Sequence, residues 1–215
     1  LPISPGAELI GAPDAALMQI ADWLRVHGHA GRWRDEALAV VSTIDGTPLA
    51  RVERGVARNL GLHTTAVQLH AQQAGTGRWW LQQRALDKAT DPGLWDTLMG
   101  GLVSADESIT QALQREAWEE AGVRLEHLPQ PPEACGRFTV RRPVDDSGSH
   151  GYLMETVHAF ACTLPAGAVP LNQDGEVLRF DAFTDAEIDT LVVQGQLTLE
   201  AAVAVALCRA PVLRA

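Results

Sequence analysis

A chain of 215 residues, 46% of them hydrophobic and 20% charged, is long enough to bury a core in one large domain, or in a compact domain with an appendage. Its 17 basic and 27 acidic residues give a net charge of −10, which argues against a nucleic-acid polymer as partner, because such binding rests on Lys and Arg neutralising phosphates. The sequence has no run of about 18 apolar residues, so we expect no membrane contact.

Three widely spaced cysteines, Cys135, Cys162 and Cys208, show neither the paired spacing of a zinc site nor the even number of a disulfide framework. They predict thiols in a reducing compartment, and we expect the protein to be cytoplasmic. The sequence begins at Leu1 without a methionine, so a removed targeting segment stays open as an alternative.

The first part of the chain, residues 1–62, is expected to form a small extension. Apolar residues recur at helical spacing from Asp14 to Val26, which predicts a helix. The β-branched run over residues 36–43 predicts a strand, and residues 51–61 predict a short helix. This part shows no catalytic pattern, and we expect a second domain over residues 63–215.

From residue 64 onwards, apolar and polar residues alternate. Residues 64–73 and 78–85 are predicted strands joined by an AGTG turn, which is a hairpin signal, and residues 88–101 are predicted to be a loop. After a central helix, we expect strands over 135–144, 152–164 and 177–184 and helices over 185–195 and 198–210. This mixture predicts an α/β fold whose mixed sheet is covered by helices on both sides.

The central segment runs from Gly101 to Val123 and reads GLVSADESITQALQREAWEEAGV. Ser104, followed three residues later by Glu107, has the form of a capping box and predicts a helix that starts near Ala105. Gly122 stands where a left-handed C-terminal cap is expected, so the helix should end just before it.

Three carboxylates on this helix, Glu116, Glu119 and Glu120, fall on one stripe, because positions three and four apart are neighbours on a helix surface. Crowded carboxylates repel one another unless a cation lies among them. A hard divalent cation that prefers oxygen ligands fits this need. The alternative is an ordinary acidic helix face with Arg115 as its internal partner.

The two glycines, the four glutamates and the arginine of this segment together resemble the Nudix box. The resemblance implies the Nudix fold, an α/β/α sandwich around a mixed sheet, and a hydrolase that cleaves diphosphate linkages with Mg²⁺ or Mn²⁺. It implies that Glu116, Glu119 and Glu120 hold the metal ion and that the backbone carbonyl of Gly100 adds a ligand.

Glu107 and Arg115 are two further charged residues of the box, and the general base is a further question. Glu107 either joins the metal shell through water or caps the helix, and Arg115 is expected to orient the glutamates. Glu116 is the first candidate for general base, and Glu176, in an Asp-Gly-Glu-Val turn, is the second.

A narrower resemblance comes from residues outside the box. Segments 33–36, 52–55, 60–71 and 174–177, with Arg84, Lys88 and Pro92-Gly93, look like the Nudix domains related to thiamin pyrophosphokinase. This likeness implies removal of phosphate from thiamin diphosphate or its damaged analogues. The chain departs from the group at Trp95-Asp96-Thr97, at Met99-Gly100-Gly101 and at Asp106, where the group usually has Leu-Asp-Asn, Ala-Gly-Gly and a glycine.

A thiamin-type ligand carries a cation beside its diphosphate, so its pocket should offer an aromatic face and carboxylates. The candidates in the matching segments are Trp33, Glu36, Trp95 and Asp96, while Arg84 and Lys88 could hold phosphate oxygens. Packing is the alternative for the tryptophans and surface solvation for the two cations. The expected partner is a small-molecule diphosphate, with a homodimer left open.

Three other functions stay in view. Hydrolysis of a nucleoside diphosphate sugar such as ADP-ribose is the main alternative. Residues 92–96 also resemble the approach to the box of isopentenyl-diphosphate isomerase, but that enzyme needs an early catalytic cysteine and none precedes Cys135. A non-catalytic binding module usually lacks box glutamates, and here all of them are present.

Overall fold

The computed structural model describes residues 11–42, 44–88, 90–146 and 149–209. Four parts of the predictions lie outside it: residues 1–10 of the extension, residue 43 of the strand predicted over 36–43, residue 89 of the loop predicted over 88–101, and residue 210 of the final helix. All other predicted elements can be compared with it.

The N-terminal unit consists of α1 (Pro13–Val26), β1 (Ala37–Val41), β2 (Pro48–Glu53) and α2 (Arg54–Ala57). The predicted first helix and first strand are confirmed. The helix predicted over residues 51–61 is wrong in its first part, because β2 pairs with β1 as far as Glu53. The Glu53 side chain then accepts a hydrogen bond from Gly55 N, and this cap starts the short α2.

The main sheet joins β3 (His63–Gln73), β4 (Trp79–Arg84), β5 (Trp95–Asp96), β6 (Met99–Leu102), β7 (Glu133–Asp146), β8 (Ser149–Leu164) and β9 (Val177–Phe183). Within the described residues its main order is β5-β4-β3-β8-β7, with β6 paired to β3 and β9 paired to β4. The pair β3/β8 is parallel and the other pairs are antiparallel, so the predicted mixed sheet is confirmed. The predicted loop over residues 88–101 is wrong in part, since it contains β5 and most of β6.

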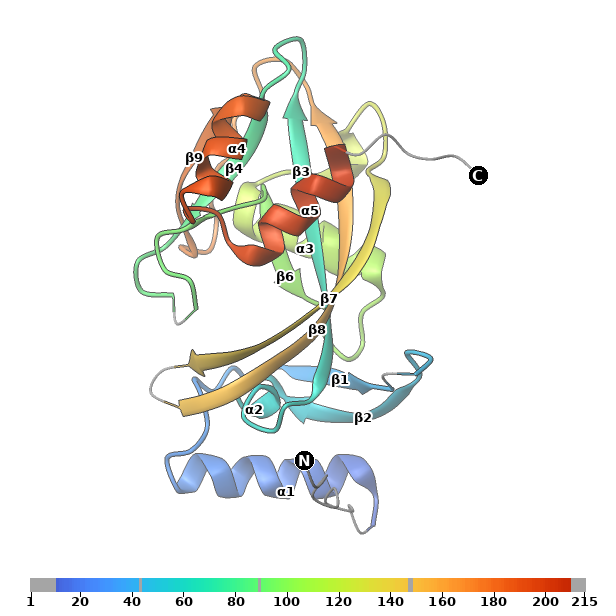
Figure 1. Ribbon diagram of the computed structural model, residues 1–215. Coiled ribbons are helices and arrows are strands. Elements are labelled where there is room, and N and C mark those ends of the chain that lie inside the picture. The colour runs from blue at the N-terminus through green and yellow to red at the C-terminus, as the bar shows by residue number, and fades with distance from the viewer. Residues whose placement is uncertain (1–10, 43, 89, 147–148, 210–215) are drawn as a thin grey trace.

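Helices cover both faces of this sheet (Figure 1), as predicted. On one face α3 (Ile109–Ala121) packs on a core that includes Val67, Leu69 and Met99. On the other face α4 (Asp185–Val193) and α5 (Leu199–Arg209) pack against Leu81 and Trp95. A third core joins the N-terminal unit to the long strands β3, β7 and β8.

Helix α3 begins four residues later than its sequence predicts. Its N-cap is Ser108, which forms a capping box with Gln111. Ser104 is instead held against the N-terminal unit, because it bridges to Leu38 and the following N–H donates to Ala37 O at 2.8 Å. The predicted C-cap is confirmed, since Gly122 has a left-handed φ of 64°.

Two general expectations can be checked on the described residues. None of the helices there is both long and apolar enough to cross a membrane. The three cysteines carry free thiols, and Cys162 is buried.

Candidate active site

A cavity of about 530 Å³ opens where α3, β6, β3 and β8 meet the turn before β9 and the start of α5. The box glutamates lie at the end where β6 pairs with β3, with Gly100 opposite Gln68. The other end is marked by Glu155 of β8, which lies opposite Thr64, four residues away along β3. Among the described residues, eleven carboxylates and six Arg or Lys side chains line this cavity. The carboxylates outnumber the cationic side chains, so a ligand that carries positive charge would be attracted to this cavity.

Arg115 is the hub of the box end. Its guanidinium forms a bidentate ion pair with Glu107 at 2.7 and 2.8 Å, and a third N–H contact reaches Leu102 O at 3.1 Å. The Nη1 nitrogen donates to Glu116 at 2.8 Å and to Glu119 at 3.0 Å. The hydrogen bonds to Glu107 and the charge of Glu116 raise the pKa of Arg115 further above its usual range. Arg115 therefore contacts two box glutamates through one nitrogen while it is anchored to Glu107.

Glu116 and Glu120 point from α3 onto β6. Gly101 must lack a side chain here, because a Cβ at that position would overlap the carboxyl group of Glu116. Glu120 accepts hydrogen bonds from Gly100 N and Gln82 Nε2, both at 2.9 Å. Burial, with the nearby charge of Glu116 adding to it, raises the pKa of Glu120 to about 8.

The residues at the box end offer ligands for a divalent metal ion. The donor set is entirely oxygen, which suits Mg²⁺ or Mn²⁺. Glu116 Oε1 and Glu119 Oε2 already converge on a single cationic nitrogen, Arg115 Nη1. Within the described residues, however, no three acidic, thiol or imidazole side chains stand close enough together to enclose an ion as they are arranged. The chemistry fits a metal, while Glu120 is engaged by its protein donors.

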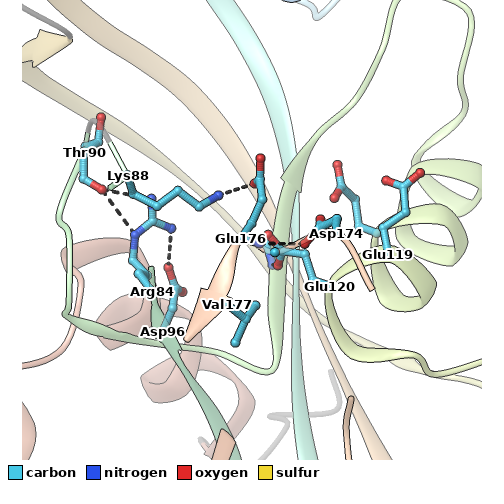
Figure 2. A network of polar contacts seen from close by, with 12 residues as sticks. Arg84, Lys88, Thr90, Asp96, Glu119, Glu120, Asp174, Glu176 and Val177 are labelled. Carbon is cyan, nitrogen blue, oxygen red and sulfur yellow. Dashed lines mark hydrogen bonds and ion pairs between the residues drawn. The ribbon is translucent and has the colours of Figure 1, made fainter. Parts of the chain in front are cut away.

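Glu176 and Lys88 face the box glutamates across the cavity and form an ion pair (Figure 2). Arg34 approaches Glu176 at 3.7 Å. Burial pushes the pKa of Glu176 up, but the hydrogen bond and charge of Lys88 outweigh it and leave the pKa lowered. The structure thus brings the second candidate base into the cavity, with two cations beside it.

Asp96 and Arg84, two predicted substrate residues, form an ion pair at 3.3 Å on the cavity wall (Figure 2). Arg84 also donates to Thr90 O, and Asp96 accepts from Gln68 at 3.1 Å. Burial raises the pKa of Asp96, although Arg84 counteracts part of the rise. Both side chains are committed to protein partners.

The N-terminal unit contributes directly to this cavity, although the sequence showed no catalytic pattern there. Glu36 accepts from Arg54 and from the Ser104 hydroxyl, both at 2.7 Å, and all three residues line the cavity. Arg54 lies close enough to Glu116 and Glu176 for their charges to raise its pKa against the opposing effect of burial. Its only sequence signal was the Val-Glu-Arg-Gly match outside the box.

The two tryptophans expected to contact a substrate lie elsewhere, and none of the described residues that line the cavity is aromatic. Trp95 is 7% exposed and packs edge-on against Phe183 in the core beneath α4 and α5. Trp33 packs beneath Arg25, and its indole N–H donates to Asp35 at 2.7 Å. The expectation that these rings stack on a ligand is therefore not supported by their positions.

Replacing Trp95 with alanine should accordingly destabilise the fold and leave substrate preference unchanged. Deleting a buried Trp side chain costs about 3–5 kcal/mol. Denaturant unfolding gives this loss, and Trp23→Ala is the matched control, because Trp23 is 54% exposed and should change stability by less than about 1 kcal/mol. A stable Trp95→Ala protein with altered substrate preference would contradict the packing role.

Comparison with known proteins gives one family. A family model for the NUDIX domain matches residues 62–202. The chain is 25% identical over 189 residues to Nudix hydrolase 24, chloroplastic, of Arabidopsis thaliana, covering 86% of this chain and 50% of that protein. It is 34% identical over 89 residues to the isopentenyl-diphosphate Delta-isomerase of Leifsonia xyli, covering 39% and 45%. The chain spans about half the length of these curated relatives.

Solved structures agree on the fold. A crystal structure of a Deinococcus radiodurans protein aligns with 81% of this chain and 100% of its own, with a TM-score of 0.61 and 18% sequence identity. At this identity the likeness extends to the fold alone.

Proposed function

This chain belongs to the Nudix family, and from that membership we propose that it is a hydrolase that cleaves a diphosphate linkage in a small molecule with a divalent metal ion, Mg²⁺ or Mn²⁺. One observation carries the proposal. Glu116 and Glu119 converge on one cationic nitrogen, with Glu120 beside them, at the end of a cavity large enough for a small molecule.

The metal ion, when bound, would lower the pKa of water and neutralise charge on the phosphate oxygens. Glu116, Glu119 and Glu120 would hold it, with Gly100 close to Glu120 through its N–H contact. Arg115 keeps two of these carboxylates in position, and its bidentate pair with Glu107 anchors it to the turn before α3. Glu107 therefore acts on the site through Arg115.

Lys88 and Arg54 are proposed to meet the phosphate oxygens. Both line the cavity, and each is held by a carboxylate, Glu176 and Glu36 respectively. An ion pair keeps such a side chain extended toward the cavity before a ligand arrives, so less conformational entropy is lost on binding. Lys88 and Arg54 thus support a diphosphate in the part of the cavity nearest the box.

For the organic half, we propose thiamin diphosphate or an oxidised analogue, cleaved to the monophosphate. Support comes from the segments shared with the thiamin-related group and from the excess of carboxylates around the cavity, which suits a cationic ligand. Trp95, in the core, and Trp33, beneath Arg25, do not add to this support. Hydrolysis of ADP-ribose is the alternative outcome.

A comparison of substrates tests this proposal. Thiamin diphosphate, an oxidised thiamin diphosphate and ADP-ribose would each be incubated with the protein and Mg²⁺ or Mn²⁺, and products separated by chromatography. We expect the higher kcat/KM on a thiamin compound, with thiamin monophosphate or its oxidised analogue as product. Faster cleavage of ADP-ribose with no monophosphate from either thiamin compound would reject the thiamin-type substrate and favour a nucleotide sugar.

A further inference from the structure

The end of the cavity away from the box is built on the strands β3 and β8. Leu153, Glu155 and Val157 alternate along β8 and all line the cavity, as expected for side chains on one face of a strand. The parallel register places Glu155 opposite Thr64 of β3. On β8, one carboxylate thus lies between two apolar residues.

Glu155 is a buried carboxylate that has few polar partners in the protein. It is 8% exposed, and its hydrogen bond from the Thr64 hydroxyl, at 3.3 Å, is long. Among the described residues no Arg, Lys or His forms an ion pair with it. Burial raises the pKa of this carboxyl group, while the more distant charge of Arg58 offsets part of the rise.

The neighbouring carboxylates differ from Glu155, because each forms an ion pair with an arginine. Asp96 pairs with Arg84, and Glu200 pairs with Arg142, both at 3.3 Å. Among the described residues, Glu155 is therefore an acid at this end without an ion-pair partner, although the more distant charges of Arg58 and Arg54 act on it. An unmatched buried charge costs stability, so its presence in a cavity wall indicates a role toward a ligand.

Gln68 supplies a second and independent observation. It is 6% exposed, lines the same cavity, and its Nε2 donates to Asp96. Its carbonyl oxygen Oε1 is buried without a hydrogen-bond partner. Swapping the amide oxygen and nitrogen would break the bond to Asp96, so the orphan atom is an acceptor. The cavity wall therefore contains a residue with an unused acceptor as well as a carboxylate without an ion-pair partner.

The strand register gives the span between the two ends. Gln68 pairs with Gly100, whose N–H holds Glu120, and Thr64 pairs with Glu155. Four residues along β3 separate these points, which corresponds to about 13 Å. A ligand whose diphosphate lies among the box glutamates would bring its organic half past Gln68 to Glu155.

We propose that Glu155, assisted by the carbonyl oxygen of Gln68, is the specificity-determining residue of this cavity and selects diphosphates whose organic half carries a positive charge and hydrogen-bond donors. The inference rests on the proposed function for the position of the diphosphate. The carboxylate of Glu155 matches the charge, and Gln68 accepts from a donor group. Neither residue takes part in the cleavage itself.

The first experiment measures binding without metal and without phosphate. Thiamin, which is cationic and bears an amino group, is titrated by calorimetry into the full chain in EDTA. Glu155→Gln should weaken its binding by about 10- to 100-fold, the effect of losing a charge-assisted contact. Glu126→Gln is the matched control, because it removes the same charge from an exposed position and should leave binding unchanged.

A second measurement separates recognition from folding. If Glu155 only accepted the hydrogen bond of Thr64, the carbonyl oxygen of glutamine could still accept it, and the variant would keep its ligand preference. We expect an unchanged or higher melting temperature, because the uncompensated charge is removed. The kcat/KM ratio of thiamin diphosphate to ADP-ribose should fall about tenfold or more. Unchanged thiamin binding, whatever the melting temperature, or an equal loss on both substrates, would overturn the inference.

The two proposals fail in different ways. Glu155-dependent thiamin binding without cleavage of any diphosphate would reject the hydrolase function and support the recognition role. Cleavage that proceeds with the same substrate preference in Glu155→Gln would reject the recognition role and support the hydrolase.

Discussion

Glu120→Gln is expected to lower kcat by more than about 100-fold while the chain stays folded. Changing even an outer-shell partner of a metal ligand costs about 10- to 100-fold in activity or metal affinity, so loss of a ligand should exceed that. Glutamine keeps the shape, and its carbonyl oxygen can still accept from Gly100 N and Gln82. The buried carboxyl disappears, so the melting temperature should hold or rise.

Glu119→Gln should lower kcat by a similar factor. It lies one residue earlier on the same stripe but is partly exposed, so its replacement is a smaller perturbation of the core. Mn²⁺ binding followed by electron paramagnetic resonance gives a readout that is independent of turnover, and both variants should bind Mn²⁺ more weakly. Glu126→Gln again serves as the control for a lost surface charge. Near-normal turnover by both variants at limiting metal would show that these carboxylates are not ligands.

The second large effect concerns the general base. Glu116→Gln is expected to lower kcat by about 10²- to 10⁴-fold, the usual contribution of a base. Glu176→Gln should lower it by less than about tenfold, because the charge of Lys88 lowers the pKa of Glu176 and weakens it as a base. Steady-state kinetics at saturating metal gives kcat for each variant, and Mn²⁺ affinity is measured in parallel. A variant that loses kcat but keeps its Mn²⁺ affinity has lost the general base and not a metal ligand.

Two other results would change this assignment. A larger loss of turnover in Glu176→Gln, with metal affinity retained, would make Glu176 the base and give Lys88 a positioning role. If neither variant shows a loss of kcat while its metal affinity is retained, cleavage proceeds without a protein base.

The sequence predicted the features that depend on residues close in the chain. Spacing of three and four put the box glutamates on one helix face, and Gly122 was recognisable as a C-cap because only a glycine takes a left-handed φ without strain. The hairpin of β3 and β4 followed from alternation and a short Gly-bearing turn. Each of these is a local rule.

Features set by distant contacts could not be predicted in this way. Ser104 and Glu107 have the pattern of a capping box, but pairing with β1 holds this segment as a turn and moves the helix start to Ser108. Strand β6 looks like a loop because it contains two glycines. Gly101 is required there by the close approach of Glu116.

The far end of the site was missed for the same reason. Glu155 lies in an ordinary alternating strand, and nothing near it in sequence marks a site. Its position depends on the parallel register with β3, which brings it onto the same wall as Gln68. Trp95 shows the reverse case, since a tryptophan beside the box looked like a ligand contact but fills the core under α5.

The most direct test of the metal-dependent hydrolase is phosphorus NMR of thiamin diphosphate and ADP-ribose incubated with the full chain. In the presence of Mg²⁺ or Mn²⁺, we predict that the diphosphate signals of at least one compound are replaced by monophosphate signals. Excess EDTA should stop this conversion, and added metal should restore it. Diphosphate signals that persist in both compounds with either metal, or conversion at the same rate in EDTA, would contradict the account.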